Sequence, residues 1–339
     1  MPVNDSPFSW LQVVFSFPQS VRQELVPPSR VTPIDTHKLQ HELCLHPNQA
    51  LVDYVHVISG SGFRLGFNPE SVSLKLASQN MPTAFLQASV IDQYLLTELE
   101  KGFVAGPFSI SPLTNLNISH FGIIAKKYQS GKWQLILYLS SSQGHSVNEG
   151  IPKDPFLVQY MKVDNIIESI MTHGRETCLA KFAVESAYHI IPFHSHHRYL
   201  LGMKWWGEYF IDLALPFSLR FAPFIFSSFA DLLEWIPKHN YEVQFLFHYL
   251  DDFHTLGPPD SPVCQQNLDI CVCLFSEWGI PFHPGKLEGP STCLTVLGIE
   301  LDSMAYGLAS LRRSLIVLLL FWTPAGLSNS TARERNWNI

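Results

Sequence analysis

The amino-acid sequence predicts an α+β fold in which antiparallel β-hairpins pack on helices. Pairs of short apolar segments are joined by turn-forming residues, and the longer segments between them carry apolar side chains at helical spacing. The chain has 339 residues, of which 46% are hydrophobic. That length and composition allow a substantial buried core and argue against a wholly disordered protein.

The N-terminal half combines an irregular start with helices and one hairpin. Five prolines in residues 1–32 predict a lead-in without regular structure. Val90, Tyr94 and Leu99 share one face of a predicted helix that Gly102 can end. We expect, in order, two short helices within 36–58 broken near His46, the helix at 88–102, a proline-rich turn region at 106–117, and a hairpin of 121–125 with 133–139.

The C-terminal half alternates helices with strands. Gly174 is a suitable stop for the first of these helices, and we expect Pro237 to end the second. The predicted elements are a helix at 164–173, a strand at 179–184, a hairpin of 199–203 with 208–213, a helix at 223–235, a hairpin over 243–256 and a helix at 261–278. One more helix is expected at 312–322, before a polar tail without pattern.

Two adjacent carboxylates, Asp251 and Asp252, lie between apolar residues at the predicted turn of the hairpin over 243–256. Neighbouring ionised aspartates repel each other, so a hydrophobic setting favours them where a cation is close. Mg²⁺ commonly takes one or two protein carboxylates and leaves its other positions to water and phosphate. An ordinary Asp-Asp turn is the alternative, and the flanking segments argue against it.

An ordered series of segments between residues 131 and 301 resembles the motifs of reverse transcriptases. Tyr249 to Asp252 (YLDD) resembles the family's Y-x-D-D box. The other matching segments are 131–140 (GKWQLILYLS), 181–188 (KFAVESAY), 215–223 (LPFSLRFAP), 283–286 (HPGK) and 297–301 (LGIEL). The chain as a whole is similar to the reverse transcriptase domains of DIRS-like and gypsy-like retrotransposon polyproteins.

The resemblance implies a polymerase right-hand fold with fingers and palm, an antiparallel palm sheet packed on helices, and a thumb that is largely missing. It divides the chain into four parts. These are an irregular or helical lead-in at 1–60, a helical extension with fingers at 61–162, the palm at 163–311, and a truncated or aberrant tail at 312–339.

The resemblance also implies an RNA-directed DNA polymerase. Asp251 and Asp252 match the family's catalytic, metal-binding aspartates, with Mg²⁺ as cofactor and Mn²⁺ as an alternative. The expected partners are an RNA template, a DNA primer and deoxynucleotides. Matches to the family's nucleotide- and template-binding positions are Tyr188, Phe217, Arg220, Lys286 and Lys132, and Tyr188 matches the residue that excludes a ribose 2′-hydroxyl.

Four signature positions depart from the family pattern. Ala183 stands where the family has its first metal-binding aspartate, and Glu185, two residues further, is a poor replacement. Tyr138 replaces an aspartate, Gln134 an arginine and Ser218 a glycine. These losses imply weak or absent polymerase activity. A non-catalytic relic that binds RNA or protein is the alternative, and an unrelated enzyme with an Asp-Asp metal site would leave the flanking motifs unexplained.

Charge and composition bound the remaining possibilities. The net charge of −7 argues mildly against nucleic-acid binding by bulk electrostatics, although 121–220 is a net-positive segment. The six cysteines show no repeated C-x-x-C spacing, so we expect reduced, mostly buried thiols. Histidines 194, 196 and 197 resemble a zinc site, but an exposed loop is the favoured interpretation. Without a signal peptide or membrane span, we expect a location in the cytoplasm or nucleus, and no pattern indicates an oligomer.

Overall fold

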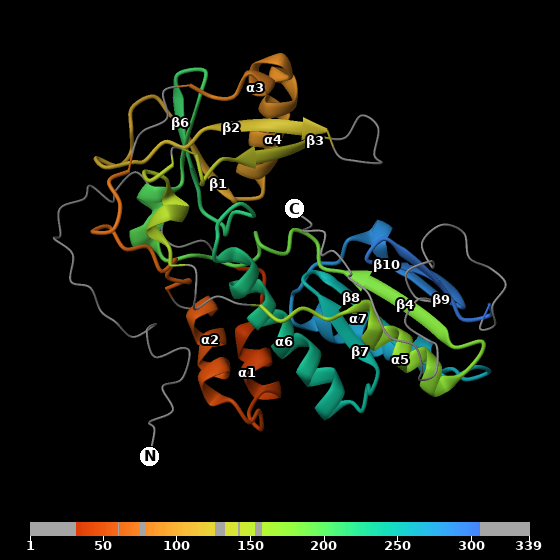
Figure 1. The fold of residues 1–339 in the computed structure, drawn as a ribbon. Helices are drawn as coiled ribbons and strands as arrows, with labels where there is room; N and C mark the ends of the chain where they lie inside the picture. Colours follow the sequence, from red (N-terminus) through yellow and green to blue (C-terminus); the bar gives the residue numbers. More distant parts are fainter. Residues whose placement is uncertain are drawn as a thin grey trace, which may run out of the picture.

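The computed structural model describes residues 32–305, apart from 60, 75–78, 126–132, 142 and 153–157. Helices and antiparallel sheets form two groups of elements (Figure 1). Of the predicted irregular start at 1–32, residues 1–31 lie outside the described residues, as do the helix expected at 312–322 and the tail that follows it. None of the described helices is both long enough and apolar enough to cross a bilayer.

The first group contains a three-stranded sheet, a two-stranded sheet and two helices, seen at the top of Figure 1. The three-stranded sheet has the order β1-β6-β5, and β2 pairs with β3. The elements are α3 (Pro82–Leu86), α4 (Ala88–Glu100), β1 (Val104–Phe108), β2 (Phe121–Ala125), β3 (Trp133–Leu137), β5 (Gly202–Trp205) and β6 (Glu208–Asp212). The helix expected at 88–102 and the hairpins of 121–139 and 199–213 are thus confirmed, although residues 195–200 form a 3₁₀ helix before β5 begins.

The second group is built around a four-stranded antiparallel sheet of order β7-β8-β4-β9. Its strands are β4 (Cys178–Ala183), β7 (Leu246–Tyr249), β8 (Asp252–Gly257) and β9 (Glu288–Ser291). The helices are α5 (Val163–His173), α6 (Ala222–Asn240) and α7 (Val263–Glu277), and β10 (Cys293–Val296) pairs with β11 (Ile299–Asp302). The strand at 179–184 and the helices at 164–173 and 261–278 are confirmed.

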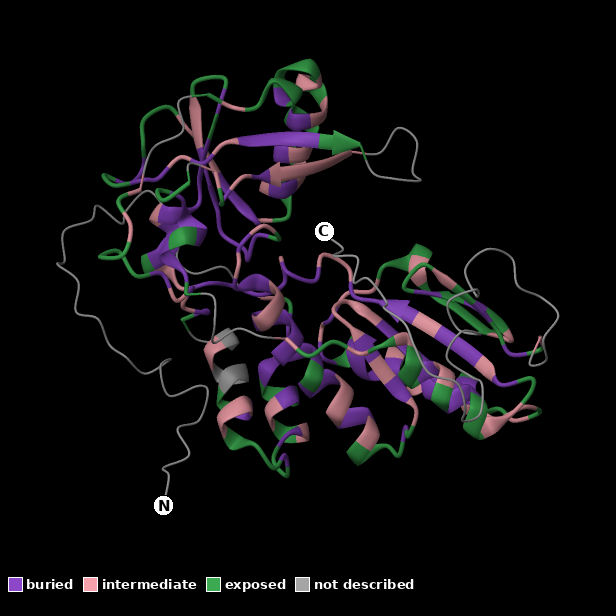
Figure 2. Cartoon of the chain, viewed as in Figure 1, coloured by how far each residue is buried: buried purple, intermediate pink, exposed green. Residues whose placement is uncertain are grey.

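Alternation along β4 and β8 explains how this sheet is covered on both faces. Phe182 and Phe253 point to one face, where their rings stack at a centroid distance of 5.2 Å and pack on Phe275 of α7. Leu179 and Leu256 point to the other face and join a cluster with α5 and the β10-β11 hairpin. Figure 2 shows the resulting burial along β4 and the inner sides of the helices.

Two short helices, α1 (Thr36–Glu42) and α2 (Gln49–Ser59), confirm the predicted pair and its break near His46. They lie beside α6 in Figure 1. Their apolar side chains belong to the largest buried cluster, which also includes residues of α6 and α7.

Three local expectations are wrong. Pro237 lies within α6, which continues to Asn240. Its ring is buried, so burial of this end of the helix outweighs the lost hydrogen bond and the clash with the preceding turn that proline causes in a helix. The expected turn at Gly106 and Pro107 is part of β1, where an irregular register beside β6 accommodates a residue without an N–H. The thiols are free, but three of the six are exposed, namely those of Cys44, Cys273 and Cys293.

Candidate functional site

The predicted Asp-Asp hairpin is confirmed. Strands β7 and β8 are antiparallel, with Leu246 opposite Thr255 at one end and Tyr249 opposite Asp252 at the turn. Leu250 takes a positive φ of 53°, which closes the turn within two residues. The backbone N–H of Val184 donates to the Asp251 carbonyl at 3.0 Å, so the turn is also fastened to the end of β4.

Both carboxylates of this hairpin reach solvent in part. The side chains of Asp251 and Asp252 are 33% and 37% exposed. Burial raises the pKa of Asp251 and the neighbouring Asp252 carboxylate raises it further, whereas Lys286 opposes both effects. The hairpin therefore holds two repelling acidic groups at the edge of the core.

Ala183 lies directly opposite Asp252 in the antiparallel register of β4 and β8. Directly opposed residues of such a pair present their side chains on the same face of the sheet. The alanine is 1% exposed and offers no ligand atom. Glu185 lies beyond the end of β4, where its N–H donates to the Pro281 carbonyl at 2.9 Å.

Lys286 supplies the cation beside the two aspartates. Its ammonium lies 3.2 Å from Oδ2 of Asp251 and 3.0 Å from Oδ1 of Asp252. Burial alone would lower the pKa of Lys286, but the two carboxylates outweigh burial and raise it. Asp251, Asp252 and Lys286, which belong to the matched segments 249–252 and 283–286, are therefore in contact.

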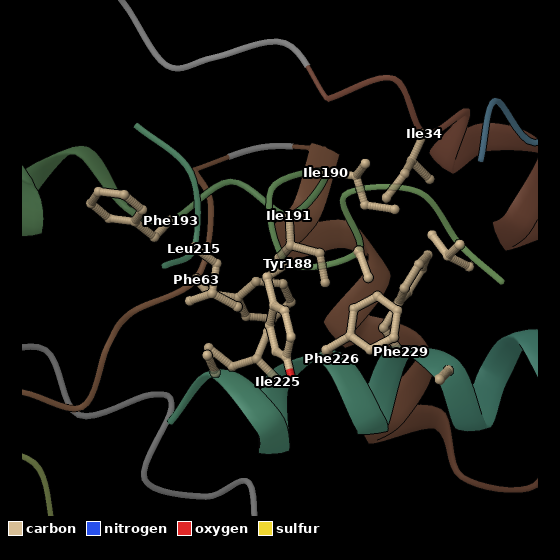
Figure 3. Packing of buried hydrophobic residues seen from close by; sticks show 14 of the residues in the cluster. Ile34, Phe63, Tyr188, Ile190, Ile191, Phe193, Leu215, Ile225, Phe226 and Phe229 are labelled. Atoms are coloured by element: carbon tan, nitrogen blue, oxygen red, sulfur yellow. The ribbon is translucent and has the colours of Figure 1, made fainter. Parts of the chain in front are cut away.

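Tyr188 and Phe217, both predicted to bind nucleotide or template, are in contact. Their rings meet edge to face at a centroid distance of 5.4 Å, with Tyr188 buried and Phe217 56% exposed. The Tyr188 hydroxyl is buried without a hydrogen-bond partner among the described residues. Burial raises the pKa of Tyr188, and the nearby Asp251 carboxylate raises it further. Figure 3 shows Tyr188 between Ile191 and Ile225 in the core.

Arg220, three residues after Phe217, is held by contacts to residues 148 and 151. One of its guanidinium nitrogens donates to the Ile151 carbonyl at 2.6 Å, and its backbone N–H donates to Oδ1 of Asn148 at 2.8 Å. The Asn148 amide also donates to the Ser218 carbonyl at 2.9 Å. Asn148 thus fixes the loop that carries Phe217 and Arg220, a role that no sequence pattern indicated. Lys132, the remaining predicted site residue, lies outside the described residues.

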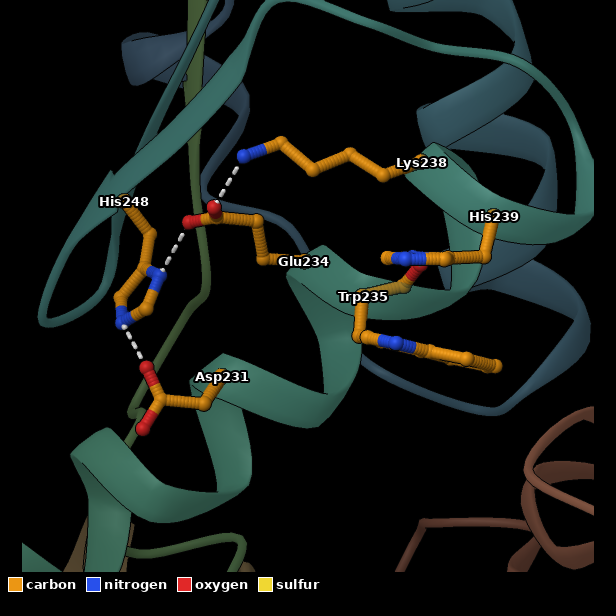
Figure 4. Close-up of polar contacts among 6 residues, drawn as sticks. All are labelled: Asp231, Glu234, Trp235, Lys238, His239 and His248. Atoms are coloured by element: carbon orange, nitrogen blue, oxygen red, sulfur yellow. Dashed lines mark hydrogen bonds and ion pairs between the residues drawn. The ribbon is translucent and has the colours of Figure 1, made fainter. Parts of the chain in front are cut away.

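A partly buried ion cluster links β7 to α6, and sequence reasoning missed it (Figure 4). His248 Nδ1 lies 2.6 Å from a Glu234 carboxylate oxygen, and its Nε2 lies 3.5 Å from Asp231. Lys238 contacts the other oxygen of Glu234. Burial raises the pKa of Glu234, but the His248 hydrogen bond and the Lys238 charge outweigh burial and lower it. The spacing of 231, 234 and 238 on one helix face was the available signal.

Of the histidines at 194, 196 and 197, which we expected in an exposed loop, only His196 is exposed, and it lies in the 3₁₀ helix of residues 195–200. His197 is 8% exposed in the 3₁₀ helix, and its Nδ1 accepts a hydrogen bond of 2.9 Å from the Leu65 N–H. Burial, followed by the charges of His194 and Arg64, lowers the pKa of His197 to about 3. Within the described residues, no group of three or more His, Cys, Asp or Glu is arranged to hold a metal ion.

The residues at the hairpin fit one Mg²⁺ better than two. Asp251 and Asp252 offer carboxylate oxygens, the donors that Mg²⁺ prefers. Ala183 contributes none, and the ammonium of Lys286 already lies between the two carboxylates.

Comparison with solved structures shows a reverse-transcriptase-like fold. A mutant protease–reverse transcriptase of prototype foamy virus is similar at a TM-score of 0.53 and 15% identity, over 81% of this chain and 36% of that one. The foamy viral protein in complex with dsDNA gives a TM-score of 0.51 at 15% identity, over 88% of this chain and 60% of that chain. The foamy viral protein in complex with an RNA/DNA hybrid gives a TM-score of 0.52 at 16% identity, over 82% of this chain and 37% of that chain.

These likenesses concern the fold, because the identities are low. The chain spans 36% to 60% of the lengths of these foamy virus chains. No protein-family model matches the sequence, and no curated protein matches it.

Proposed function

We propose that this chain is a reverse transcriptase domain derived from a retrotransposon of the DIRS-like or gypsy-like group, with weak or absent polymerase activity. The observation that carries the proposal is the hairpin that presents Asp251 and Asp252 beside Lys286, in a fold similar to that of reverse transcriptases. The reaction class is addition of deoxynucleotides to a DNA primer on an RNA template.

The proposed architecture follows from the same likeness. We assign residues 163–311 to the palm, with the four-stranded sheet as its centre, and 61–162 to a helical extension with fingers. We assign residues 1–60 to the lead-in. Tyr188 and Phe217 would line the nucleotide site, with Arg220 and Lys132 near the template or phosphates.

Each residue has a proposed task in the reaction. Asp251 and Asp252 would hold Mg²⁺ or Mn²⁺, which in this class of enzyme lowers the charge barrier between primer hydroxyl and triphosphate. Tyr188 would exclude the ribose 2′-hydroxyl, since its ring is fixed by Phe217 and by the core. The alanine at 183 supports the proposal of weak activity because it removes one of three expected carboxylates.

Primer extension on an RNA template in the presence of Mg²⁺ tests this proposal. We expect little or no extension by the unmodified chain and a gain for Ala183→Asp, whose new carboxylate would face the hairpin beside Asp252. Ala183→Asn is the matched control, because it has the same size without the charge. Robust extension by the unmodified chain would contradict the damaged site.

A non-catalytic role in binding RNA or protein is the second candidate, favoured by the alanine at 183 and by the ammonium between the aspartates. Binding to an RNA/DNA hybrid that weakens steeply with salt, without extension by any variant, would support this role. Absence of extension by every variant, Ala183→Asp included, would contradict the first candidate, and absence of hybrid binding would contradict the RNA-binding form of the second.

A further inference from the structure

Lys286 is placed by backbone contacts at the end of β4, the strand that carries Ala183. The N–H of His283 donates to the Ala183 carbonyl at 2.9 Å, and the N–H of Lys286 donates to the His283 carbonyl at 2.9 Å. Phe282 also forms a β-bridge with Val184. The strand that lacks the third carboxylate thus fixes the segment that carries the lysine.

The ammonium bridges the two aspartates instead of pairing with one. It contacts one oxygen from each carboxylate, at 3.2 Å and 3.0 Å. Two carboxylates and one ammonium leave a single net negative charge, and Ala183 adds none. The repulsion between Asp251 and Asp252 is therefore relieved without any external cation.

We propose that Lys286 is a built-in counter-cation of the Asp251–Asp252 pair, which excludes Mg²⁺ and Mn²⁺ from these carboxylates until it swings away. The proposal rests on the proposed function only in taking the two aspartates as the metal-binding groups. A divalent ion would need oxygens at about 2.0–2.1 Å and would lie in the space between the carboxylates that the ammonium fills. The lysine side chain is 44% exposed, so it has room to leave.

The alternative is an ordinary surface ion pair. Such a pair contributes little and would not affect metal binding. The two interpretations differ in what removal of the ammonium does. Under our proposal, Lys286→Met leaves two unneutralised carboxylates that gain affinity for a divalent ion.

Mn²⁺ titration followed by electron paramagnetic resonance tests the proposal on the full chain. We expect Lys286→Met to bind Mn²⁺ at least tenfold more tightly than the unmodified chain. Lys181→Met is the matched control, because Lys181 lies in the same sheet but contacts Glu288 and the Thr295 carbonyl. Equal affinities for Lys286→Met and Lys181→Met would overturn the proposal.

Thermal unfolding provides a second readout that does not depend on activity. Without metal, we expect Lys286→Met to melt at a lower temperature and Mn²⁺ to restore the loss. If that variant does not fold, Lys286→Met with Asp252→Asn restores the charge balance and should fold without a Mn²⁺ response. A double variant that Mn²⁺ stabilises would overturn the proposal.

The outcomes for the counter-cation and for the polymerase are separable. Tighter Mn²⁺ binding by Lys286→Met, without extension by any variant, would contradict the proposed reverse transcriptase and support Lys286 as the counter-cation. A gain of extension in Ala183→Asp, with Mn²⁺ affinity unchanged in Lys286→Met, would do the reverse.

Discussion

Single residues decide the chemistry at the candidate site. One alanine, Ala183, pairs with Asp252 and brings no side-chain oxygen to the hairpin. One lysine, Lys286, contacts both remaining carboxylates. Tyr188 is buried nearby with its hydroxyl unpaired among the described residues. Substitutions of single residues are therefore expected to have effects that can be measured separately.

Replacement of Tyr188 by phenylalanine is expected to stabilise the protein. A buried hydroxyl without a partner loses its hydration on folding, so its removal should raise the free energy of unfolding by about 1 kcal/mol. Chemical denaturation measures this change. Tyr241→Phe is the control, since that hydroxyl donates to Glu42 at 2.8 Å and its loss should not stabilise. A destabilised Tyr188→Phe would show that the hydroxyl has a partner.

Because the pKa of His197 is lowered, we expect the free energy of unfolding to fall as the solution becomes acidic. Its folded-state pKa of about 3 lies below the ordinary value of 6.5, because burial and nearby positive charges disfavour the imidazolium. Between these values the unfolded chain binds a proton that the folded chain does not. This histidine's contribution is therefore complete above pH 6.5 and falls by about 1.4 kcal/mol for each pH unit below it.

Denaturation at several pH values between 7 and 5 tests this dependence. His197→Asn keeps an acceptor for the Leu65 N–H without titrating, so its stability should fall less steeply with pH. His37→Asn is the control, because His37 is exposed. Equal slopes for the unmodified chain and His197→Asn would contradict the assignment.

At the scale of elements, β8 connects the site to the core. Asp252 at its first position faces the site, while Phe253 is fully buried against Phe182 and α7. The strand ends at Gly257, where α7 comes close. A Cβ at position 257 would lie 2.4 Å from the backbone nitrogen of Cys264.

Gly257→Ala is expected to destabilise the protein by at least 2 kcal/mol. The added methyl group would clash with the backbone near the start of α7, and the helix cannot move without disturbing its packing on β8 and β4. Gly285→Ala is the control, since its nearest neighbour is the His283 side chain at 3.3 Å. Comparable urea midpoints for the two variants would contradict the close approach.

At the scale of the molecule, one buried cluster extends from Ile34 to Ile280 and includes α1, α6 and α7. Polar contacts reinforce it. Asn240 and Tyr241, at the end of α6, both bond Glu42 of α1, at 2.8 Å each. The elements before residue 60 are therefore part of the same core as the sheet that carries the site.

Leu43→Ala is expected to destabilise the distant four-stranded sheet as well as α1. Leu43 is fully buried, and a cavity of this kind costs about 2–5 kcal/mol. Hydrogen exchange at the β4 amides should report the loss, because the core is shared. Leu45→Ala, at a side chain that is 82% exposed, is the control. Unchanged protection of β4 would show that the sheet folds separately.

The sequence by itself determined most local elements and the position of Asp251 and Asp252 at the turn of a hairpin. Apolar periodicity and turn residues are short-range signals, so the hairpin of Asp251 and Asp252 and most helices were predicted correctly. The helix end at Pro237 and the turn at Gly106 were predicted wrongly. The helix continues through Pro237 and Gly106 lies in a strand, because burial and sheet pairing overrode the local preference of proline.

Only the tertiary structure decided how distant residues meet. The bridge from Lys286 to both aspartates, the contact of Tyr188 with Phe217, and the link from His248 to Glu234 join segments that no spacing relates. Such contacts depend on sheet order and on the packing of α6 and α7. These are set by burial of the whole core and not by any single segment.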